Sequence, residues 1–266
     1  MEVGDIVGRK SYGCDVFFRV TNILNEQRIV LTGVNYRLLV CAETNDLRPI
    51  RLDVLRDFRM RFIDDAESRV RKIIQSRPNR DDCKAGKVLH IDSDPEYLKI
   101  CLHYYDQLAV PAIGENIVEY QQANQIVQYL ERDFPDILVI TGHDSLYNKK
   151  APGNMENYRS SGFFREAIRA ARCFNPSKDS LVIIAGACQS NYEALIEAGA
   201  NIASSPGRIL IHALDPVFAA EKIAFTSIET VLDMEDILEN SVTGRQGLGG
   251  YQTRGVMREG FKARMA

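Results

Sequence analysis

Several features that assign a protein to a familiar class are missing from this sequence of 266 residues. It has no apolar segment near its N-terminus of the kind that secretion signals contain. No apolar run approaches the roughly 18 residues that a membrane-spanning helix needs. We therefore expect neither a standard secretory leader nor a membrane partner.

Cofactor and metal motifs are missing as well. The sequence has no GxGxxG and no P-loop, and its six cysteines form no CxxC pair and no zinc-ligand spacing. They are scattered at positions 14, 41, 83, 101, 173 and 188, which is typical of reduced thiols inside a cell. We therefore expect no cofactor and no metal ion.

The net charge of −3 gives no general attraction to nucleic acid, which is therefore not an expected partner. The charge is nevertheless uneven. Residues 1–80 carry 15 Lys and Arg against 11 Asp and Glu, a net of +4, whereas residues 81–266 carry 18 against 25, a net of −7. A basic part beside an acidic part indicates contact with an anionic partner or contact of the two parts with each other.

The first 50 residues have the pattern of short strands. β-Branched and aromatic residues gather at 16–23, 28–31 and 36–42, with polar or glycine-containing turns between them. No helix of ordinary length fits in this region. Residues 1–50 are therefore predicted to form a small β-barrel that most resembles the SH3-like type.

The period of the apolar residues changes after residue 50. From 52 to 75 they recur at helical spacing among many charges, which predicts an amphipathic helix or a pair of helices. The stretch from 75 to 87 is polar and contains Pro and Gly, as linkers do. Residues 51–82 are interpreted as a helical connector and linker.

The rest of the chain, residues 83–266, alternates between apolar strands and helices. Strands are predicted at 87–91, 110–117, 137–141, 181–185 and 208–213, with helices at 97–108, 121–133, 159–173 and 192–198. Strands that are apolar on both faces and alternate with helices form a parallel sheet that helices cover on both sides. An α/β domain with a mostly parallel sheet is therefore expected.

Two reactive side chains follow strands of that sheet. His143 comes after ILVITG and Cys188 after LVIIAGA. Ligands of open parallel sheets bind beyond the carboxyl ends of the strands, and a right-handed crossover makes these two strands neighbours. A cysteine at a strand end is often only a small buried apolar residue. The pair, however, suits a thiol enzyme in which Cys188 is the nucleophile and His143 is the base that later protonates a leaving amine.

These two segments resemble the caspase–gingipain–clostripain group of cysteine proteases. Ala187-Cys188-Gln189 is similar to the start of the caspase signature, and the separation, 188 − 143 = 45, is close to the roughly 50 of that group. The resemblance implies a caspase-like fold and peptide hydrolysis through a thioester. The group has glycine directly after its histidine, whereas this chain has Asp144. By resemblance, the backbone N–H of Asp144 is the expected oxyanion donor, together with the backbone N–H of Cys188.

Over nearly its whole length the chain also resembles the YabG family of sporulation-specific proteases. Residues 1–19, 137–145, 181–193 and 199–216 carry this resemblance. It implies an endopeptidase of the mother-cell cytoplasm, with association with the spore coat, that trims spore-coat and related spore proteins. It also implies cleavage near Arg or other basic residues and self-cleavage, for which an Arg in the arginine-rich stretch 48–80 is the candidate.

Cleavage after arginine requires a carboxylate that pairs with the guanidinium. Asp92 and Asp94 follow the first predicted strand of the sheet, and Asp215 follows the fifth. Caspase-like proteins commonly carry specificity residues at these two places. Asp94 and Asp215 equally suit the caps of the helices that follow them, and the Asp144 side chain is a fourth candidate.

Two other functions stay open. A class I glutamine amidotransferase also carries its cysteine on a strand-to-helix turn, but its histidine comes later in the chain. Here the only later histidine is His212, within a predicted strand, and a contact of Cys188 with His212 would favour this reading. The other alternative is a non-catalytic protein that binds nucleic acid or coat protein through its barrel. Salt-dependent nucleic-acid binding without proteolysis would favour it. The sequence indicates no oligomeric state.

Overall fold

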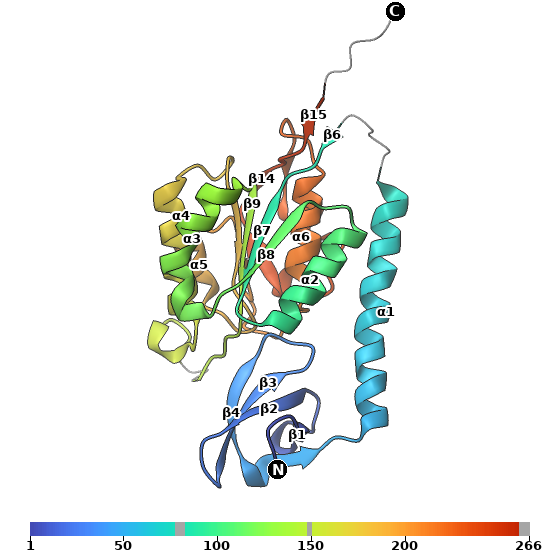
Figure 1. The fold of residues 1–266 in the computed structure, drawn as a ribbon, viewed down its shortest axis with the longest axis vertical. Helices are drawn as coiled ribbons and strands as arrows, with labels where there is room; N and C mark the ends of the chain where they lie inside the picture. Colours follow the sequence, from blue (N-terminus) through green and yellow to red (C-terminus); the bar gives the residue numbers. More distant parts are fainter. Residues whose placement is uncertain (78–82, 148–150, 261–266) are drawn as a thin grey trace, which may run out of the picture.

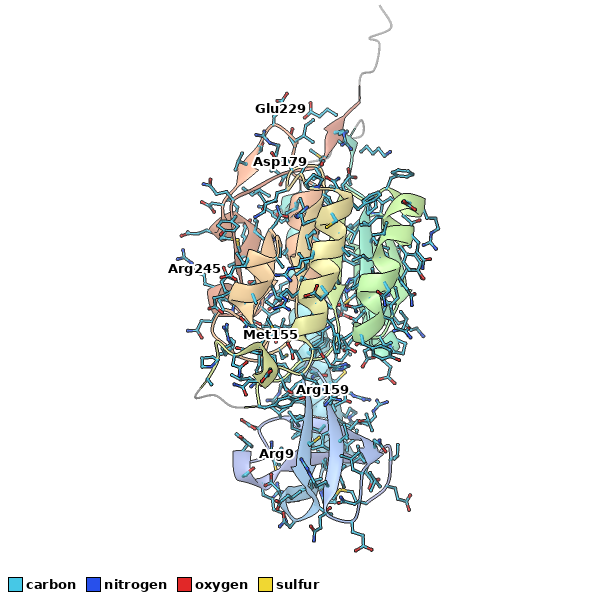
Figure 2. All side chains as sticks on the ribbon, turned by 90° about the vertical axis from the view of Figure 1, so that its left-hand side faces the viewer. Arg9, Met155, Arg159, Asp179, Glu229 and Arg245 are labelled. Atoms are coloured by element: carbon cyan, nitrogen blue, oxygen red, sulfur yellow. The ribbon has the colours of Figure 1, made fainter. Side chains whose placement is uncertain are left out.

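The computed structural model describes residues 1–77, 83–147 and 151–260. An antiparallel sheet built from the N-terminal residues lies at one end of the molecule, below a larger layered α/β part (Figure 1). A long helix, α1, runs along the side of both. Turned by 90°, the molecule shows Arg9 on the N-terminal sheet and Arg159 close to the junction, with Asp179 and Glu229 at the far end (Figure 2).

The N-terminal sheet has five antiparallel strands in the order β4-β3-β2-β1-β5. They are β1 (Ile6–Arg9), β2 (Phe17–Ile23), β3 (Arg28–Gly33), β4 (Leu39–Glu43) and β5 (Leu47–Pro49). The predicted strands correspond to β2, β3 and β4, while the short β1 and β5 are additional. The antiparallel sheet is thus confirmed. The SH3-like barrel stays a prediction, since β4 and β5 form the two ends of the sheet and do not pair within the described residues.

Helix α1 (Leu52–Ser76) is a single helix of 25 residues, about 38 Å long. Of the two predicted forms, one helix or a pair, the structure has the first. Leu55, Ala66, Val70 and Ile73 form its buried side. The last three of these join the core of the α/β part, so most of α1 is packed along that part. The predicted linker residues 78–82 lie outside the described residues.

The main sheet has six strands in the order β13-β11-β10-β9-β7-β8. They are β7 (Val88–Asp92), β8 (Ala112–Asn116), β9 (Ile137–Thr141), β10 (Val182–Ala185), β11 (Ile202–Ser204) and β13 (Leu248–Gly250). Every pairing is parallel except that of β13 with β11 at one edge. The strands β7, β9 and β10 are buried at every residue, as strands covered on both faces should be. The mostly parallel sheet is therefore confirmed.

Helices cover both faces of this sheet (Figure 1). One face packs on α1, α2 (Pro95–Gln107), α6 (Asp215–Ala224) and α7 (Met234–Leu238), and the other on α3 (Glu119–Asp133), α4 (Ser161–Phe174) and α5 (Tyr192–Glu197). Two small ribbons pair β6 (Cys83–Lys84) with β15 (Arg258–Glu259) and β12 (Val231–Leu232) with β14 (Thr253–Arg254). The 3-10 helices are Lys10–Tyr12, Thr44–Asp46, Met155–Asn157 and Gly244–Gln246. None of the helices in the described residues combines the length and apolar character that crossing a bilayer requires.

The predicted position of the fifth strand is wrong. The sequence places it at 208–213, but β11 is Ile202–Ser204, and residues 208–213 are not a strand. The apolar run at 208–213 is buried for a different reason, because Leu210 and Ile211 pack against the core of the N-terminal sheet. An apolar run signals burial, and here it is tertiary contact rather than sheet pairing that buries it.

Candidate active site

The candidate site lies at the carboxyl ends of three neighbouring strands, β7, β9 and β10. The order of strands along the sheet reverses between β7 and β9, since β8 lies on one side and β10 and β11 on the other. Such a reversal opens a crevice at the carboxyl edge, where α/β proteins bind ligands. Asp92 ends β7, while His143 follows β9 and Cys188 follows β10. The predicted neighbourhood of the last two strands is confirmed by their parallel pairing.

Cys188 stands on a tight turn between β10 and α5. Gly186 has φ of +112°, and a Cβ there would come within 2.9 Å of Leu195 and 3.0 Å of Ser204. Only glycine avoids both the strain and the clash. Gln189, on the other side of Cys188, also has a positive φ, 59°. The backbone is therefore bent sharply on both sides of Cys188, which fixes where its side chain lies.

The Cys188 side chain has no exposed surface. Its Sγ accepts a hydrogen bond from the backbone N–H of Ile211 at 3.5 Å and lies 3.8 Å from the Ile211 carbonyl oxygen. Burial raises the pKa of the thiol to about 12, although the Ile211 hydrogen bond and the charge of Arg37 act in the opposite direction. In this conformation Cys188 is therefore a neutral, covered thiol.

His143 is also buried, with 6% of its surface exposed. Its backbone N–H donates to Glu119 Oε1 at 2.8 Å, and its ring makes an edge contact with Tyr97, 5.9 Å between centroids. Nε2 lies 3.4 Å from Asp94 Oδ2, close enough for an ion pair, but within the described residues it makes no hydrogen bond. Burial lowers the pKa of His143, and Asp94 is the largest opposing influence. The imidazole is thus neutral at neutral pH.

His212 lies in the segment next to Cys188 but is held elsewhere. Its ring stacks on Phe62 of α1, 4.1 Å between centroids, and Nδ1 accepts a hydrogen bond from the Leu214 N–H at 3.3 Å. Within the described chain the Nε2 atoms of His143 and His212 have no hydrogen-bond partner, so neither atom is bonded to Cys188. The position after β9, a sheet neighbour of β10, is what favours His143.

The Asp144 side chain joins the loops that carry the two predicted catalytic residues. It accepts hydrogen bonds from the backbone N–H groups of Ser145 and Ser160, both at 2.8 Å, and from the hydroxyl groups of Ser161 and Ser190. Its carboxylate is therefore fully used inside the protein. Its backbone N–H, the predicted oxyanion donor, points at the carbonyl oxygen of Arg37 at 3.4 Å.

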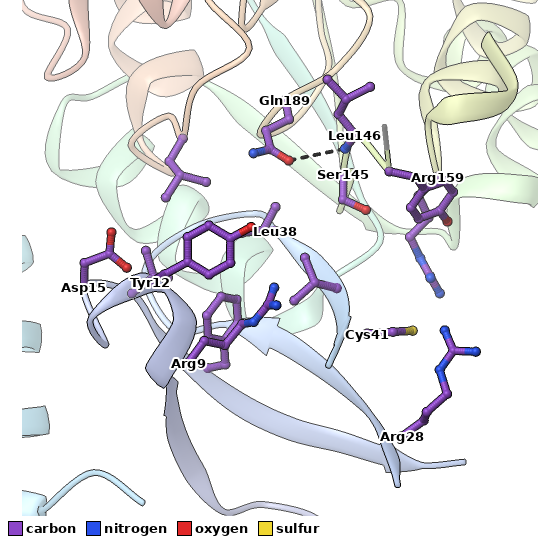
Figure 3. A pocket seen from close by; sticks show the side chains of 15 residues that line it. Arg9, Tyr12, Asp15, Arg28, Leu38, Cys41, Ser145, Leu146, Arg159 and Gln189 are labelled. Atoms are coloured by element: carbon purple, nitrogen blue, oxygen red, sulfur yellow. Dashed lines mark hydrogen bonds between the residues drawn. The ribbon is translucent and has the colours of Figure 1, made fainter. Parts of the chain in front are cut away.

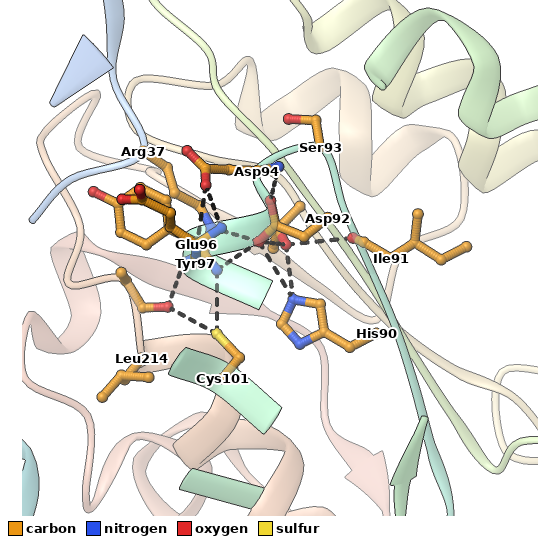
Figure 4. A network of polar contacts seen from close by, with 12 residues as sticks. Arg37, His90, Ile91, Asp92, Ser93, Asp94, Glu96, Tyr97, Cys101 and Leu214 are labelled. Atoms are coloured by element: carbon orange, nitrogen blue, oxygen red, sulfur yellow. Dashed lines mark hydrogen bonds and ion pairs between the residues drawn. The ribbon is translucent and has the colours of Figure 1, made fainter. Parts of the chain in front are cut away.

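Arg37 is a buried arginine beside the candidate site that the sequence pattern does not reveal (Figure 4). It comes from the turn between β3 and β4 and is completely buried in the α/β part. Its Nη2 and Nε donate to Asp92 Oδ2 at 2.7 and 3.1 Å, and Nη1 donates to the Ala213 carbonyl oxygen. Nη2 also contacts Cys101 Sγ at 3.2 Å, and the guanidinium lies 5.0 Å from the centre of the Tyr97 ring. The one sequence signal is a charge inside the apolar run YRLLV, which requires a buried partner.

Asp92 is held as a charged group by its neighbours. Burial acts to raise its pKa, but the charge of Arg37 outweighs burial with the help of His90 and the Asp94 N–H, so the pKa is lowered. The Thr141 hydroxyl donates to Asp92 Oδ2 at 2.8 Å, and His90 Nε2 lies 2.8 Å from that hydroxyl oxygen. Burial lowers the pKa of His90 to about 3, so this histidine is neutral. Asp92 therefore presents a fixed carboxylate that is already paired with an arginine.

Comparison with known proteins identifies the family. The model of the YabG peptidase U57 family matches residues 2–262. The chain belongs to the YabG peptidase U57 family. It is also 40% identical to the sporulation-specific protease YabG of Bacillus subtilis strain 168, over 98% of this chain and 97% of that protein. The resemblance found in the sequence is thus confirmed, and the chain is a peptidase of a family whose relative is named for sporulation.

In this YabG-family peptidase three of the four candidate acids of the substrate pocket, Asp92, Asp94 and Asp215, differ in their contacts. Asp94 caps α2, accepting hydrogen bonds from the N–H groups of Glu96 and Tyr97 at 2.8 and 3.2 Å. Asp215 is buried and accepts from the N–H groups of Val242 and Thr243 at 2.6 and 3.2 Å. Burial raises the pKa of Asp215. Of the three, only Asp92 pairs with an arginine in the structure.

Two clefts of the YabG-family peptidase lie between the N-terminal sheet and the α/β part. The larger, of about 670 Å³, is lined by Leu38 and Val40 on one side and by Ser145 and Gln189 on the other (Figure 3). Arg9, Arg28 and Arg159 also line it, with Asp15 as the acid. The smaller, of about 230 Å³, is lined by Gly33, Val34, Asp94 and Tyr97. Among the described residues, no group of three or more His, Cys, Asp or Glu side chains is placed to hold a metal ion.

Proposed function

We propose that this YabG-family peptidase is a cysteine endopeptidase with a caspase-like catalytic domain, in which Cys188 is the nucleophile and His143 the general base. One observation carries the proposal. The loops that follow β9 and β10 lie beside each other, since the Ser190 hydroxyl donates to Asp144, and both meet the turn that carries Arg37. The Asp144 N–H donates to the Arg37 carbonyl oxygen, and the next residue, Leu38, packs in the same apolar core as Cys188.

The proposed reaction has two stages, formation of a thioester on Cys188 and hydrolysis of that thioester. Cys188 Sγ attacks the scissile carbonyl carbon, and its proton passes to His143. The C–N bond then breaks, and the imidazolium gives that proton to the leaving amine, which leaves a thioester on Cys188. Water, deprotonated by His143, attacks the thioester carbon. The acid product departs, the proton returns to the sulfur, and the free thiol is restored.

The oxyanion of each tetrahedral intermediate needs hydrogen-bond donors. We assign this role to the backbone N–H groups of Asp144 and Cys188, which belong to the loops after β9 and β10. The contact of the Asp144 N–H with a peptide carbonyl oxygen supports the first assignment. Each such donor contributes on the order of 3 kcal/mol to stabilisation of the transition state.

The finer points of substrate and place are also proposals. We infer cleavage after Arg or another basic residue, with Asp92 as the carboxylate of the pocket, supported by its pairing with Arg37. Asp94 and Asp215 rank below it because, within the described residues, neither pairs with an arginine: Asp94 caps α2, and Asp215 accepts from the Val242 N–H. Spore-coat and related spore proteins as substrates, and the mother-cell cytoplasm or spore coat as the place, agree with the name of the Bacillus subtilis relative.

Self-processing is part of the same proposal. The candidate arginines between 48 and 80 include many inside α1, which must unwind locally before an extended peptide can enter a site. Arg77 is held by Glu221 at 2.5 Å, and Arg80 lies outside the described residues. Mass spectrometry of wild type and Cys188→Ala tests the idea, because a self-cleaved fragment must end in arginine and appear only in wild type.

Substitution of the two proposed catalytic residues tests the central claim. With an unfolded, arginine-containing protein as substrate, Cys188→Ala should lower kcat/KM at least about a thousandfold, and His143→Ala about a hundredfold or more. Cys173→Ala is the matched control, because Cys173 is an exposed cysteine on α4 and should leave cleavage unchanged.

Two results would contradict this assignment. Equal cleavage by wild type and Cys188→Ala would exclude a thiol mechanism at that residue. Loss of activity in His212→Ala with little effect of His143→Ala would transfer the base to His212, the arrangement expected of the amidotransferase alternative.

A further inference from the structure

One residue of the N-terminal sheet reaches every part of the proposed site. The Arg37 guanidinium pairs with Asp92, its carbonyl oxygen accepts from the Asp144 N–H at 3.4 Å, and the next residue, Leu38, packs in the same apolar core as Cys188. In a peptidase, a substrate residue just before the scissile bond makes these three kinds of contact. Its side chain enters the pocket, its carbonyl oxygen faces the oxyanion donors, and its backbone lies against the nucleophile.

The backbone around Arg37 is paired as a bound peptide would be. Leu38 forms a parallel bridge with Asp144, and the Leu39 N–H donates to the Asp144 carbonyl oxygen at 3.4 Å. Extended peptides commonly bind by adding a strand to an exposed edge, so that main-chain hydrogen bonds give affinity and pockets give specificity. Residues 34–38, here called the Arg37 segment, form the turn between β3 and β4 and meet the loop after β9 through this one parallel bridge.

The contacts of the Arg37 guanidinium are of the kind that a binding pocket makes with an arginine side chain. A carboxylate, a carbonyl oxygen and the face of an aromatic ring surround it, from Asp92, Ala213 and Tyr97. A planar fork of five donors suits such a pocket better than any other side chain. A buried ion pair is weak evidence of a stabilising role, because apolar residues of equal volume often stabilise a protein as well or better. The completely buried pair therefore needs another explanation.

The two clefts lie on opposite ends of the Arg37 segment. Gly33 and Val34 line the smaller cleft, whereas Leu38 and Val40 line the larger (Figure 3). The Arg37 segment therefore connects residues that line one cleft with residues that line the other. Cys188 also belongs to the apolar core of the N-terminal sheet, which explains why it has no exposed surface.

We propose that the Arg37 segment is a built-in substrate mimic: it occupies the arginine pocket and covers Cys188, and so holds the peptidase inactive until the segment is displaced. This inference rests on the proposed function for its catalytic part. The covering of Cys188 by the segment is independent of catalysis. The two parts therefore need separate measurements.

The first measurement is the rate at which iodoacetamide alkylates Cys188 in the full chain, followed by peptide mapping. Arg37→Ala removes the side chain that anchors the segment, so alkylation should accelerate about tenfold or more. Hydrolysis of a small fluorogenic peptide ending in arginine should rise by a similar factor. Arg169→Ala is the matched control, because Arg169 is an exposed arginine on α4, outside the N-terminal sheet and the stretch 48–80, and both rates should equal those of wild type.

A second variant covers the case in which Arg37→Ala does not fold, since it leaves the buried Asp92 without a partner. The double variant Arg37→Ala with Asp92→Asn removes both charges. Its Cys188 should be alkylated as fast as that of the single variant. Its hydrolysis of the arginine peptide should be at least about tenfold slower than that of the single variant. If the single variant does not fold, wild type is the reference for hydrolysis. Cooperative thermal unfolding above the assay temperature confirms that exposure of Cys188 is local.

The outcomes separate the two ideas. Fast alkylation without any hydrolysis that depends on Cys188 would confirm the covering and remove the proposed function. Hydrolysis that depends on Cys188, with both rates unchanged in the Arg37 variants, would confirm the function and overturn the substrate mimic. Slow alkylation of the double variant, at the wild-type rate, would overturn the mimic in the same way.

Discussion

At the scale of single residues, the site depends on carboxylates that the protein keeps from water. Asp144 has no exposed surface, and burial raises its pKa to about 6 despite four hydrogen bonds that favour the charged form. Asp92, equally buried, keeps a lowered pKa because Arg37 lies beside it. The difference follows from the neighbours: hydroxyl and amide groups only partly compensate for lost hydration, whereas a guanidinium overcomes it.

The raised pKa of Asp144 predicts how stability depends on pH. Because the pKa is about 6 in the folded chain and 3.8 ordinarily, the folded state binds more protons between these values. The contribution of Asp144 to stability is therefore present below about pH 4 and is lost as the pH rises through 6, by about 3 kcal/mol. Asp144→Asn cannot titrate. Urea unfolding at pH 4, 5, 6 and 7 should show wild type losing stability relative to this variant as pH rises, and parallel curves would contradict the prediction.

The sequence locates some site residues and not others for a physical reason. Cys188 and His143 are visible because each follows an apolar strand, and the ends of parallel strands share one edge. Asp92 is visible in the same way. Arg37 is not, because its partner lies 55 positions further along the chain and in another layer. Only a tertiary contact brings this residue to the candidate site, and local pattern does not encode which buried acid it meets.

At the scale of elements, local periodicity predicts what packs but not always where. The charged helix α1 follows from its apolar spacing, because one stripe is buried whatever it packs against. The strand expected at 208–213 does not form, since its apolar residues are buried by the N-terminal sheet instead. The short β11 carries three small or medium residues and gives little signal of its own. Whether such a short segment forms a strand depends on the strands with which it can pair, and these strands are distant in sequence.

The packing of α1 on the α/β part is tested by two adjacent residues. Ile73 is 3% exposed and belongs to the main core, whereas Ile74 is 51% exposed on the same turn. Ile73→Ala should lower the free energy of unfolding by about 2–4 kcal/mol, through lost burial and the cavity left behind. Ile74→Ala should change it by less than about 0.5 kcal/mol. Denaturant unfolding measures the free energy of unfolding of both variants. Equal losses would mean that α1 does not pack on the α/β part in solution.

At the scale of the whole molecule, the basic N-terminal residues and the acidic remainder meet each other. Among the residues that the structure describes, two ion pairs cross from the N-terminal sheet to the α/β part. Arg37 with Asp92 is completely buried at 2.7 Å, and Arg19 with Glu96 is at 2.9 Å with both side chains partly in solvent. The uneven charge of the sequence left open an anionic partner or contact between the parts. These pairs show that the parts do contact each other.

The two ion pairs predict different responses of the docked state to salt. The Debye length falls from about 14 Å at 0.05 M to about 4 Å at 0.5 M, which screens an exposed pair but leaves a buried one nearly unchanged. If Arg37 and the apolar core around Cys188 hold the sheet in place, iodoacetamide should alkylate Cys188 of wild type at rates that differ by less than about twofold between these salt concentrations. Cys173, exposed on α4, corrects for any effect of salt on the reagent itself. An increase of tenfold or more at high salt would mean that surface charges, which salt screens in this range, hold the N-terminal sheet against the site. The buried Arg37 would then contribute little to that contact.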